Sequence, residues 1–118
     1  MNVVDSSAWV SYLMDERHAE ALAEPLADLD RLLVPSITLT EVFKYTARVS
    51  DARVALRAMV QMKRGRVVAL DESLAIEAAQ FGLRYKLPLA DSIIYATAQR
   101  YDALLWTRDA DFIDLPGV

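Results

Sequence analysis

The sequence predicts an α/β fold: one domain with a mainly parallel central sheet of about four to five short strands, covered by helices on both faces. Short apolar runs alternate along the chain with longer stretches of helical character, which is typical of parallel strands joined by right-handed helical crossovers. The chain has 118 residues, of which 54% are hydrophobic. This length is enough for one core but not for two, so a single domain over residues 1–118 is expected.

Four short runs of apolar and β-branched residues predict the strands, since such residues favour strands. In chain order they are "MNVVD" at 1–5, "RLLVP" at 31–35, "RVVAL" at 66–70 and "ALLWT" at 103–107. In a parallel sheet covered by helices, ligands bind beyond the carboxyl ends of the strands. The residues that follow each run are therefore the first candidates for a functional site.

Six stretches between these runs predict helices, at about 6–14, 17–30, 36–49, 51–64, 71–85 and 88–100. Residues that favour N-caps stand at the start of four of them: Ser6 or Ser7, Ser36, Ser50 and Asp71. The stretch 36–49 also carries apolar residues at the spacing of one helix face. The stretch 17–30 is rich in Ala and Leu, but Pro25 is expected to break or restart it.

The composition excludes several kinds of site. The chain has no Cys, which excludes disulfides and thiolate zinc sites, and His18 is its only His. Zinc binding and histidine-dependent catalysis are therefore not expected, and His18 is given no role. The N-terminus has no basic region ahead of an apolar segment, and no apolar run reaches membrane-spanning length. A cytoplasmic protein without membrane association is expected.

Four acidic residues stand where a parallel sheet would place a site. Asp5 ends the first predicted strand, Glu41 lies in the second turn of the helix after the second strand, and Asp109 follows the fourth strand. Asp91 stands in the first turn of the helix 88–100, among apolar residues. It is either an acid that the helix dipole favours at a helix N-terminus or a fourth member of the site. The rule that ligands bind beyond the carboxyl ends of the strands, called the strand rule below, does not place Asp91, because this residue does not follow a strand.

Carboxylates packed together predict a bound cation, because they raise one another's pKa unless positive charge neutralises them. Oxygen-only ligands suit hard ions such as Mg²⁺, which assist the hydrolysis of phosphodiester bonds. The formal net charge of −4 argues against a nucleic-acid partner, because phosphate binding relies on basic surfaces. However, removing the four site acids from 17 Asp and Glu leaves 13, which equals the 13 Lys and Arg. The surface outside the site is then neutral on balance.

Three motifs, "VDSSAWV", "PSITLTEVFKY" and "LPLADSIIYATAQRYDALLWTRDADF", resemble the PIN domain over residues 5–112. The short single-domain form resembles the VapC ribonuclease toxins of toxin–antitoxin pairs. The resemblance implies a PIN-like three-layer α/β/α fold in which Asp5, Glu41, Asp91 and Asp109 coordinate Mg²⁺ or Mn²⁺ and RNA is cut by hydrolysis. It also implies that Ser6 or Ser7 and Thr107 support the site by hydrogen bonds. A cognate antitoxin protein and a second copy of the chain are the expected protein partners.

Further residues near these motifs are candidates with open alternatives. Asp111 could also reach a metal, but it is expected to cap the short turn before Phe112. Basic and aromatic residues near the motifs are candidates for RNA binding: Lys44, Tyr45, Arg48, Arg84, Lys86 and Arg108. For the first three, which share the Glu41 face, the alternative is an intrahelical pair between Glu41 and Lys44; for the others it is a solvated surface charge.

Several alternatives for the whole protein stay open. The apolar stripe between Val54 and Met62 has three interpretations: part of the core, a homodimer surface, or a groove for an antitoxin helix. A non-toxin PIN nuclease in RNA processing and a non-catalytic PIN-fold binding module are the other functions considered. A response-regulator receiver is disfavoured because two serines follow Asp5 and "WTRDADF" offers no matching Lys.

Overall fold

A sheet of four parallel strands lies at the centre of the computed structural model, which describes residues 1–14, 19–112 and 114–118. The strands are β1 (Asn2–Val4), β2 (Leu32–Pro35), β3 (Arg66–Val68) and β4 (Leu104–Trp106). Their order is β3-β2-β1-β4, and each neighbouring pair is parallel. β1 is therefore central, and Val3 aligns with Leu33 on one side and Leu105 on the other. The predicted parallel sheet is confirmed.

Helices occupy the connections between the strands. They are α1 (Ser6–Leu13), α2 (Ala23–Ala27), α3 (Ser36–Val49), α4 (Ala52–Met62), α5 (Glu72–Tyr85) and α6 (Leu89–Arg100). Short 3-10 turns also occur, namely η1 (Ala19–Leu22), η2 (Leu29–Arg31) and η3 (Ala110–Phe112). In the described part of the chain, none of the helices has the length and apolar character needed to span a bilayer.

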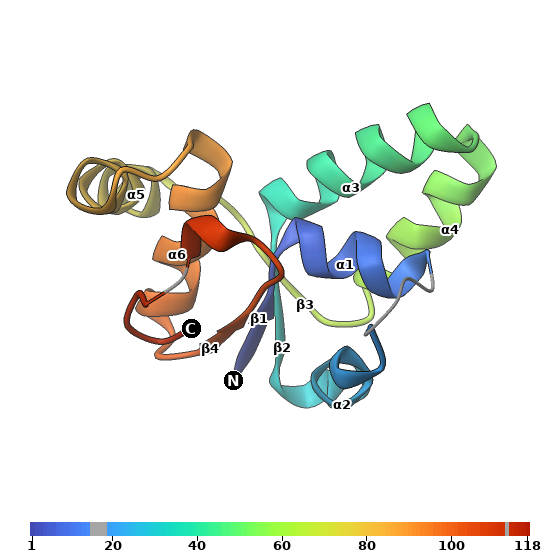
Figure 1. Ribbon diagram of the computed structural model, residues 1–118, viewed down its shortest axis with the longest axis horizontal. Coiled ribbons are helices and arrows are strands. Elements are labelled where there is room, and N and C mark those ends of the chain that lie inside the picture. The colour runs from blue at the N-terminus through green and yellow to red at the C-terminus, as the bar shows by residue number, and fades with distance from the viewer. Residues whose placement is uncertain (15–18, 113) are drawn as a thin grey trace.

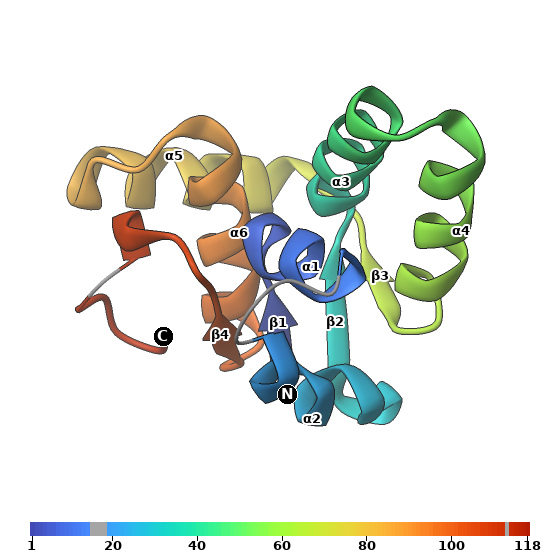
Figure 2. The ribbon, with the colours of Figure 1, turned by 45° about the vertical axis from the view of Figure 1, so that its right-hand side comes forward.

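The helices form a layer on each face of the sheet, as Figures 1 and 2 show. Strand residues alternate between the faces: Val3 and Leu33 pack with α5 and α6, while Val4 and Val34 pack with α1, α2 and α4. α6 is the most deeply placed of these helices, since its residues 92–98 are all buried. The predicted three-layer α/β/α fold is confirmed.

The starts of α1 and α4 differ from the prediction. α1 is capped by Asp5 and not by Ser6 or Ser7, and α4 is capped by Asp51, whereas Ser50 ends α3. In both helices the capping carboxylate accepts a hydrogen bond at 2.9 Å from the amide three residues further on. Asp and Ser are about equally favourable at this position, so the residue that still has extended backbone where the helix begins becomes the cap, and this is Asp5 in α1 and Asp51 in α4.

The caps of α3 and α5 show one error and one success of the prediction. Ser36 is already the first residue of α3, and Pro35 takes the cap position without a side-chain hydrogen bond. Pro35 lies between the end of β2 and the first turn of α3, and its side chain has no hydrogen-bonding group that could cap the helix. Asp71 caps α5 as predicted, with 2.8 Å between Oδ1 and the Leu74 amide.

The predicted helical stretch 17–30 is divided into η1, α2 and η2. Pro25 lies in the first turn of α2, where its missing N–H has no intrahelical partner to lose. The start of the stretch falls on residues 15–18, which include His18 and lie outside the described residues.

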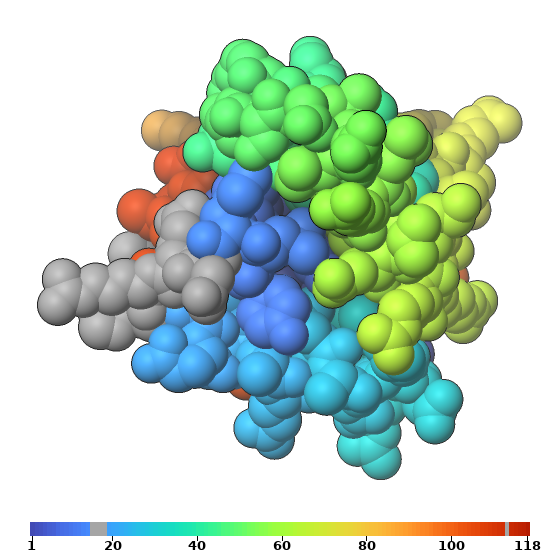
Figure 3. Space-filling view, turned by 90° about the vertical axis from the view of Figure 1, so that its right-hand side faces the viewer, coloured from blue at the N-terminus to red at the C-terminus, as the bar shows by residue number. Residues whose placement is uncertain are grey.

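The apolar stripe of α4 is divided between core and surface. Ala55, Ala58 and Met62 are buried, and the last two pack beside β2 and α1, which confirms the core alternative for these three residues. Leu56 and Val60 face solvent, with exposed fractions of 59% and 68%. Figure 3 shows the face on which α1 is flanked by α3 and α4 on one side and by the α2 region on the other.

Candidate metal centre

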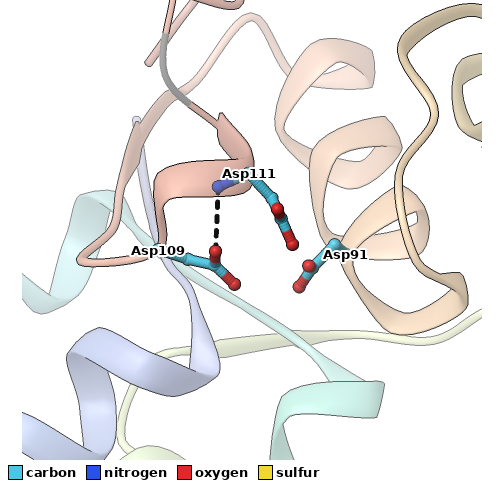
Figure 4. A group of neighbouring side chains, drawn as sticks. All are labelled: Asp91, Asp109 and Asp111. Atoms are coloured by element: carbon cyan, nitrogen blue, oxygen red, sulfur yellow. Dashed lines mark hydrogen bonds between the residues drawn. The ribbon is translucent and has the colours of Figure 1, made fainter.

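Acidic side chains from four parts of the chain gather at the carboxyl edge of the sheet. Carboxylate oxygens of Asp91, Asp109 and Asp111 all lie within 4.8 Å of one another, and Figure 4 shows the three side chains pointing toward one another. Asp5 and Glu41 stand outside this group of three but are close enough for their charges to raise the pKa of Asp91. The structure thus brings together the four predicted acids and Asp111.

Asp5 is held rigidly at the end of β1. Its side chain is buried, with 2% exposed, and burial raises its pKa. Oδ1 accepts hydrogen bonds from the Ala8 amide at 2.9 Å and the Ser7 hydroxyl at 2.8 Å, while Oδ2 accepts one from the Thr107 hydroxyl. A carboxylate offers about four acceptor sites. Three are used by these bonds, so one direction at Oδ2 is left for a further partner.

Asp91 is the most perturbed acid of the site. It lies in the first turn of α6 and is partly buried. Burial, followed by the negative charges of Asp109, Asp5, Glu41 and Asp111, raises its pKa to about 7. A helix dipole would lower the pKa of an acid in a first turn, so the dipole alone does not describe this residue. The environment of Asp91 favours either a proton or a cation at neutral pH.

The prediction that Asp111 caps the turn before Phe112 is wrong, because Asp109 takes the cap position while also belonging to the acidic cluster. Asp109 Oδ1 accepts a hydrogen bond from the Asp111 amide at 2.9 Å, so Asp109 and not Asp111 caps the turn η3 before Phe112. The reason is geometric, because an Asp side chain readily accepts from the amide two residues further on. The Asp111 carboxylate is exposed and turns toward Asp91 (Figure 4). Asp111 is therefore a stronger candidate ligand than the sequence indicated.

Glu41 is connected to the end of β1 by Ser6. The Ser6 hydroxyl donates to Glu41 Oε1 at 2.6 Å. This contact joins the first turn of α1 to the second turn of α3, two helices that pack against each other. Among the described residues Glu41 forms no ion pair with Lys44, so the intrahelical alternative is not observed. Glu41 is instead positioned beside the other acids.

Thr107 links β4 to β1 at the site. Its hydroxyl donates to Asp5 Oδ2 and accepts from the Asp109 amide at 2.8 Å, so one side chain orients two acids.

Thr107→Val keeps the shape of the side chain and removes both of these hydrogen bonds. We expect it to lower activity by roughly 10- to 100-fold, as for other residues that orient ligands. Steady-state cleavage assays measure this, with Thr40→Val on the exposed side of α3 as the control; equal activities of the two variants would contradict the role.

The basic candidates occupy different positions relative to the acids. Tyr45 borders a cleft together with Glu41 and Arg108, and the Arg48 guanidinium lies over the Tyr45 ring at 5.5 Å from its centroid. Lys44 is exposed on α3. Arg84 lies over the ring of its neighbour Tyr85, and Lys86 ends α5 with a positive φ of 56°. Neither Arg84 nor Lys86 contacts the acids through an interaction found among the described residues.

The cleft also contains residues that the sequence analysis did not select. Val10 and Ser11 line it together with Ser6 and Ser7. Each lies four residues after one of these serines, so helical spacing from the serines was the signal that could have found them.

A parallel sheet whose carboxyl edge carries clustered carboxylates defines an α/β protein with an oxygen-donor site suited to a divalent cation. The chain belongs to the PIN domain family, whose model matches residues 3–118. The resemblance expected from the sequence motifs is thereby confirmed. No curated protein matches the chain at a significant level of sequence similarity.

Several solved structures have the same fold. One is a chain of a toxin–antitoxin complex from Klebsiella pneumoniae, with 25% identity, a TM-score of 0.84, and coverage of 100% of this chain and 95% of that chain. VapC20 of Mycobacterium tuberculosis, a toxin that cleaves the sarcin–ricin loop, has 17% identity and a TM-score of 0.83, covering 100% and 97%. A chain of DNA-bound VapBC from Salmonella typhimurium has 18% identity and a TM-score of 0.80, covering 99% and 93%. The similarity extends over nearly the whole of each chain.

Proposed function

We propose that this protein is a Mg²⁺- or Mn²⁺-dependent endoribonuclease that hydrolyses RNA phosphodiester bonds, and that it is the toxin of a type II toxin–antitoxin pair. The observation that carries the proposal is the cluster of carboxylates around Asp91. Burial and the neighbouring negative charges raise the pKa of Asp91 to about 7. Such a cluster is unfavourable for the fold by itself, and a divalent cation relieves the repulsion. Perturbed acids gathered at a ligand-binding edge are typical of catalytic sites.

The residues at this edge fit a hard divalent cation. The donors are all carboxylate oxygens, the type that Mg²⁺ and Mn²⁺ prefer, and no sulfur or imidazole joins this group among the described residues. Asp5, Glu41, Asp91 and Asp109 would hold the ion, with Asp111 as a further candidate. When bound, the ion supplies Lewis-acid activation of the phosphate and of a water molecule.

The other polar residues of the site position the acids and bind the substrate. Ser7 and Thr107 orient Asp5, and Ser6 orients Glu41. Arg108 borders both the cleft beside Glu41 and a second pocket beside Asp109, a place from which it would contact an RNA phosphate. The remaining candidates for contacts to RNA are Lys44, Tyr45, Arg48, Arg84 and Lys86.

The toxin role is supported by the relatives of similar fold, which include chains described as toxins and as parts of toxin–antitoxin complexes. A cognate antitoxin is therefore the proposed protein partner, and a homodimer and a cytoplasmic location are proposed with it. The exposed residues Leu56 and Val60 of α4 offer apolar area for such an interface. The alternative of a non-catalytic PIN-fold module is disfavoured because every acid of the site is present.

Cleavage of a mixed pool of structured RNAs by the partner-free protein tests this function. The assay is run with Mg²⁺, with Mn²⁺ and with EDTA, and the cut positions are mapped. We expect discrete cuts that require the metal and disappear with EDTA. A folded protein that cuts no RNA with either metal, and binds no Mn²⁺ in a titration, would contradict the proposal.

A further inference from the structure

A cleft of about 510 Å³ adjoins the carboxylate cluster between α1 and α3. It is lined by Ser6, Ser7, Val10, Ser11, Glu41, Tyr45 and Arg108. Glu41 belongs to both the cleft and the acidic site, so a ligand in the cleft lies directly beside the proposed reaction centre. In Figure 2, α1 lies between α3 and the C-terminal segment that carries Arg108. The volume is within the range of roughly 300–1,000 Å³ found for small-molecule pockets.

The walls of the cleft combine an aromatic face, an apolar side chain and hydroxyl groups. Tyr45 has 37% of its surface exposed, so part of the residue is accessible to a ligand. The Arg48 guanidinium covers one side of its ring at 5.5 Å from the centroid, and Arg48 does not line the cleft. Tyr45 therefore lines the cleft while its ring is contacted by a cation that is not among the lining residues.

We infer that this cleft binds one unpaired nucleobase of the RNA, next to the phosphate that is cut. This inference rests on the proposed function and specifies the substrate contact at the same site. Unpaired bases bind proteins by stacking on aromatic side chains and by hydrogen bonds to their edges. Tyr45 supplies the stacking surface, and Val10, which lines the same cleft from α1, supplies apolar contact.

The charges of the cleft favour a base over a phosphate as its occupant. Among the described residues that line the cleft, Arg108 at its border is the only cation, so the walls formed by the serines, Val10 and Tyr45 offer no positive charge for a phosphate, whereas a neutral base needs none. Arg108 lies at the border between the cleft and the pocket beside Asp109, which suits the phosphate that follows the base. A base in a duplex is stacked on its neighbours and does not reach such a cleft, so the nucleotide that enters it must be unpaired.

The test uses the full chain and a short single-stranded RNA with one mapped cut site. Each of the two nucleotides on either side of the cut is replaced in turn by an abasic nucleotide. At one of these positions we expect the wild-type protein to lose roughly 5- to 140-fold in kcat/KM, which corresponds to about 1–3 kcal/mol of stacking at 1.4 kcal/mol per tenfold. Tyr45→Ala is expected to lower kcat/KM on the intact RNA by a similar factor. On the abasic RNA, Tyr45→Ala and the wild type are expected to have nearly the same kcat/KM, because the base that would stack on Tyr45 is absent.

Matched variants separate stacking from other effects of the substitution. Tyr45→Phe keeps the ring and is expected to retain activity within about twofold, since only the hydroxyl is removed. Val10→Phe fills the cleft from α1 and is expected to reduce kcat/KM without changing Mn²⁺ affinity. Tyr101→Ala is the control, because its ring also lies under an arginine, Arg66 at 5.4 Å, but packs against the core on the other face of the sheet.

Three outcomes have different meanings. Base-dependent losses that Tyr45→Ala removes support the inference. Cleavage that is unaffected by every abasic replacement and by Tyr45→Ala overturns the inference but leaves the nuclease function standing; if Tyr45→Ala then weakens only antitoxin binding, the cleft is a protein contact. Absence of any cleavage by the wild-type protein overturns the proposed function, and the inference falls with it.

Discussion

Replacing Asp91 by Asn is expected to abolish metal-dependent RNA cleavage while leaving the fold intact. The substitution removes a negative charge at nearly constant shape, and neither oxygen of Asp91 accepts a hydrogen bond within the described part of the chain. The loss in kcat/KM is expected to exceed about 100-fold, the upper value for residues that only orient a ligand. Single-turnover cleavage of a mapped RNA measures the loss, and circular dichroism checks the fold.

A matched control separates the metal role of Asp91 from the favourable position of any acid at a helix N-terminus. Glu72 also lies in the first turn of a helix, α5, but it is exposed and is not among the acids that perturb Asp91. Glu72→Gln is therefore expected to retain full activity. Mn²⁺ titration gives an independent readout, in which Asp91→Asn weakens binding and Glu72→Gln does not. Wild-type cleavage rates for Asp91→Asn would show that the assignment of the site is wrong.

The clustering of the acids of the site at one edge of the sheet was predictable from the sequence because parallel strands point the same way. Asp5 and Thr107 are 102 residues apart, yet they form a hydrogen bond because β1 and β4 are neighbours with a parallel register. The strand rule did not place Asp91. The short connection between α6 and β4 could have done so, since a helix followed at once by a strand runs antiparallel to it. Its first turn then lies at the carboxyl edge of the sheet.

Other local details depended on competition between equally suitable residues. Asp5, Ser6 and Ser7 all favour N-cap positions, and the point at which the chain leaves β1 decides among them. Asp109 and Asp111 likewise both suit a turn, and the hydrogen bond from the Asp111 amide shows which residue takes the role. Such choices depend on the backbone path of the folded chain and cannot be read from residue preferences alone.

The acidic cluster is also expected to set how the stability of the metal-free protein depends on pH. The pKa of Asp91 rises from its ordinary value of 3.8 to about 7 in the folded state. Between these values the folded protein holds a proton that the unfolded chain has released, so the free energy of unfolding falls as the pH rises. Burial raises the pKa of Asp5 as well, which adds a change of the same sign. The pKa of Asp71 is lowered from 3.8, chiefly by the hydrogen bond from the Leu74 amide. This group makes the free energy of unfolding rise with pH, but only at pH values below its ordinary pKa, so it does not alter the trend between pH 4 and 7.

Asp91→Asn is therefore expected to stabilise the metal-free protein at pH 7.5 and to have little effect near pH 4. A full shift of about three pH units would be worth about 4 kcal/mol, and solvent screening of the partly exposed carboxylate reduces this to about 2 kcal/mol. For a domain of this size the gain corresponds to roughly 5–10 °C in Tm. Thermal unfolding followed by circular dichroism at both pH values, in EDTA, measures it.

Mn²⁺ should reverse the order of the Tm values of the two proteins. An ion that binds only the folded state stabilises the wild type, whereas Asp91→Asn lacks one of the ligands and gains less from the ion. A single substitution that removes activity, raises metal-free stability and removes stabilisation by metal would be difficult to attribute to a surface acid or a helix cap. If Asp91→Asn instead left Tm unchanged at pH 7.5 both with and without Mn²⁺, the charge repulsion at the site would be too weak to require a cation, and the metal centre itself would be contradicted.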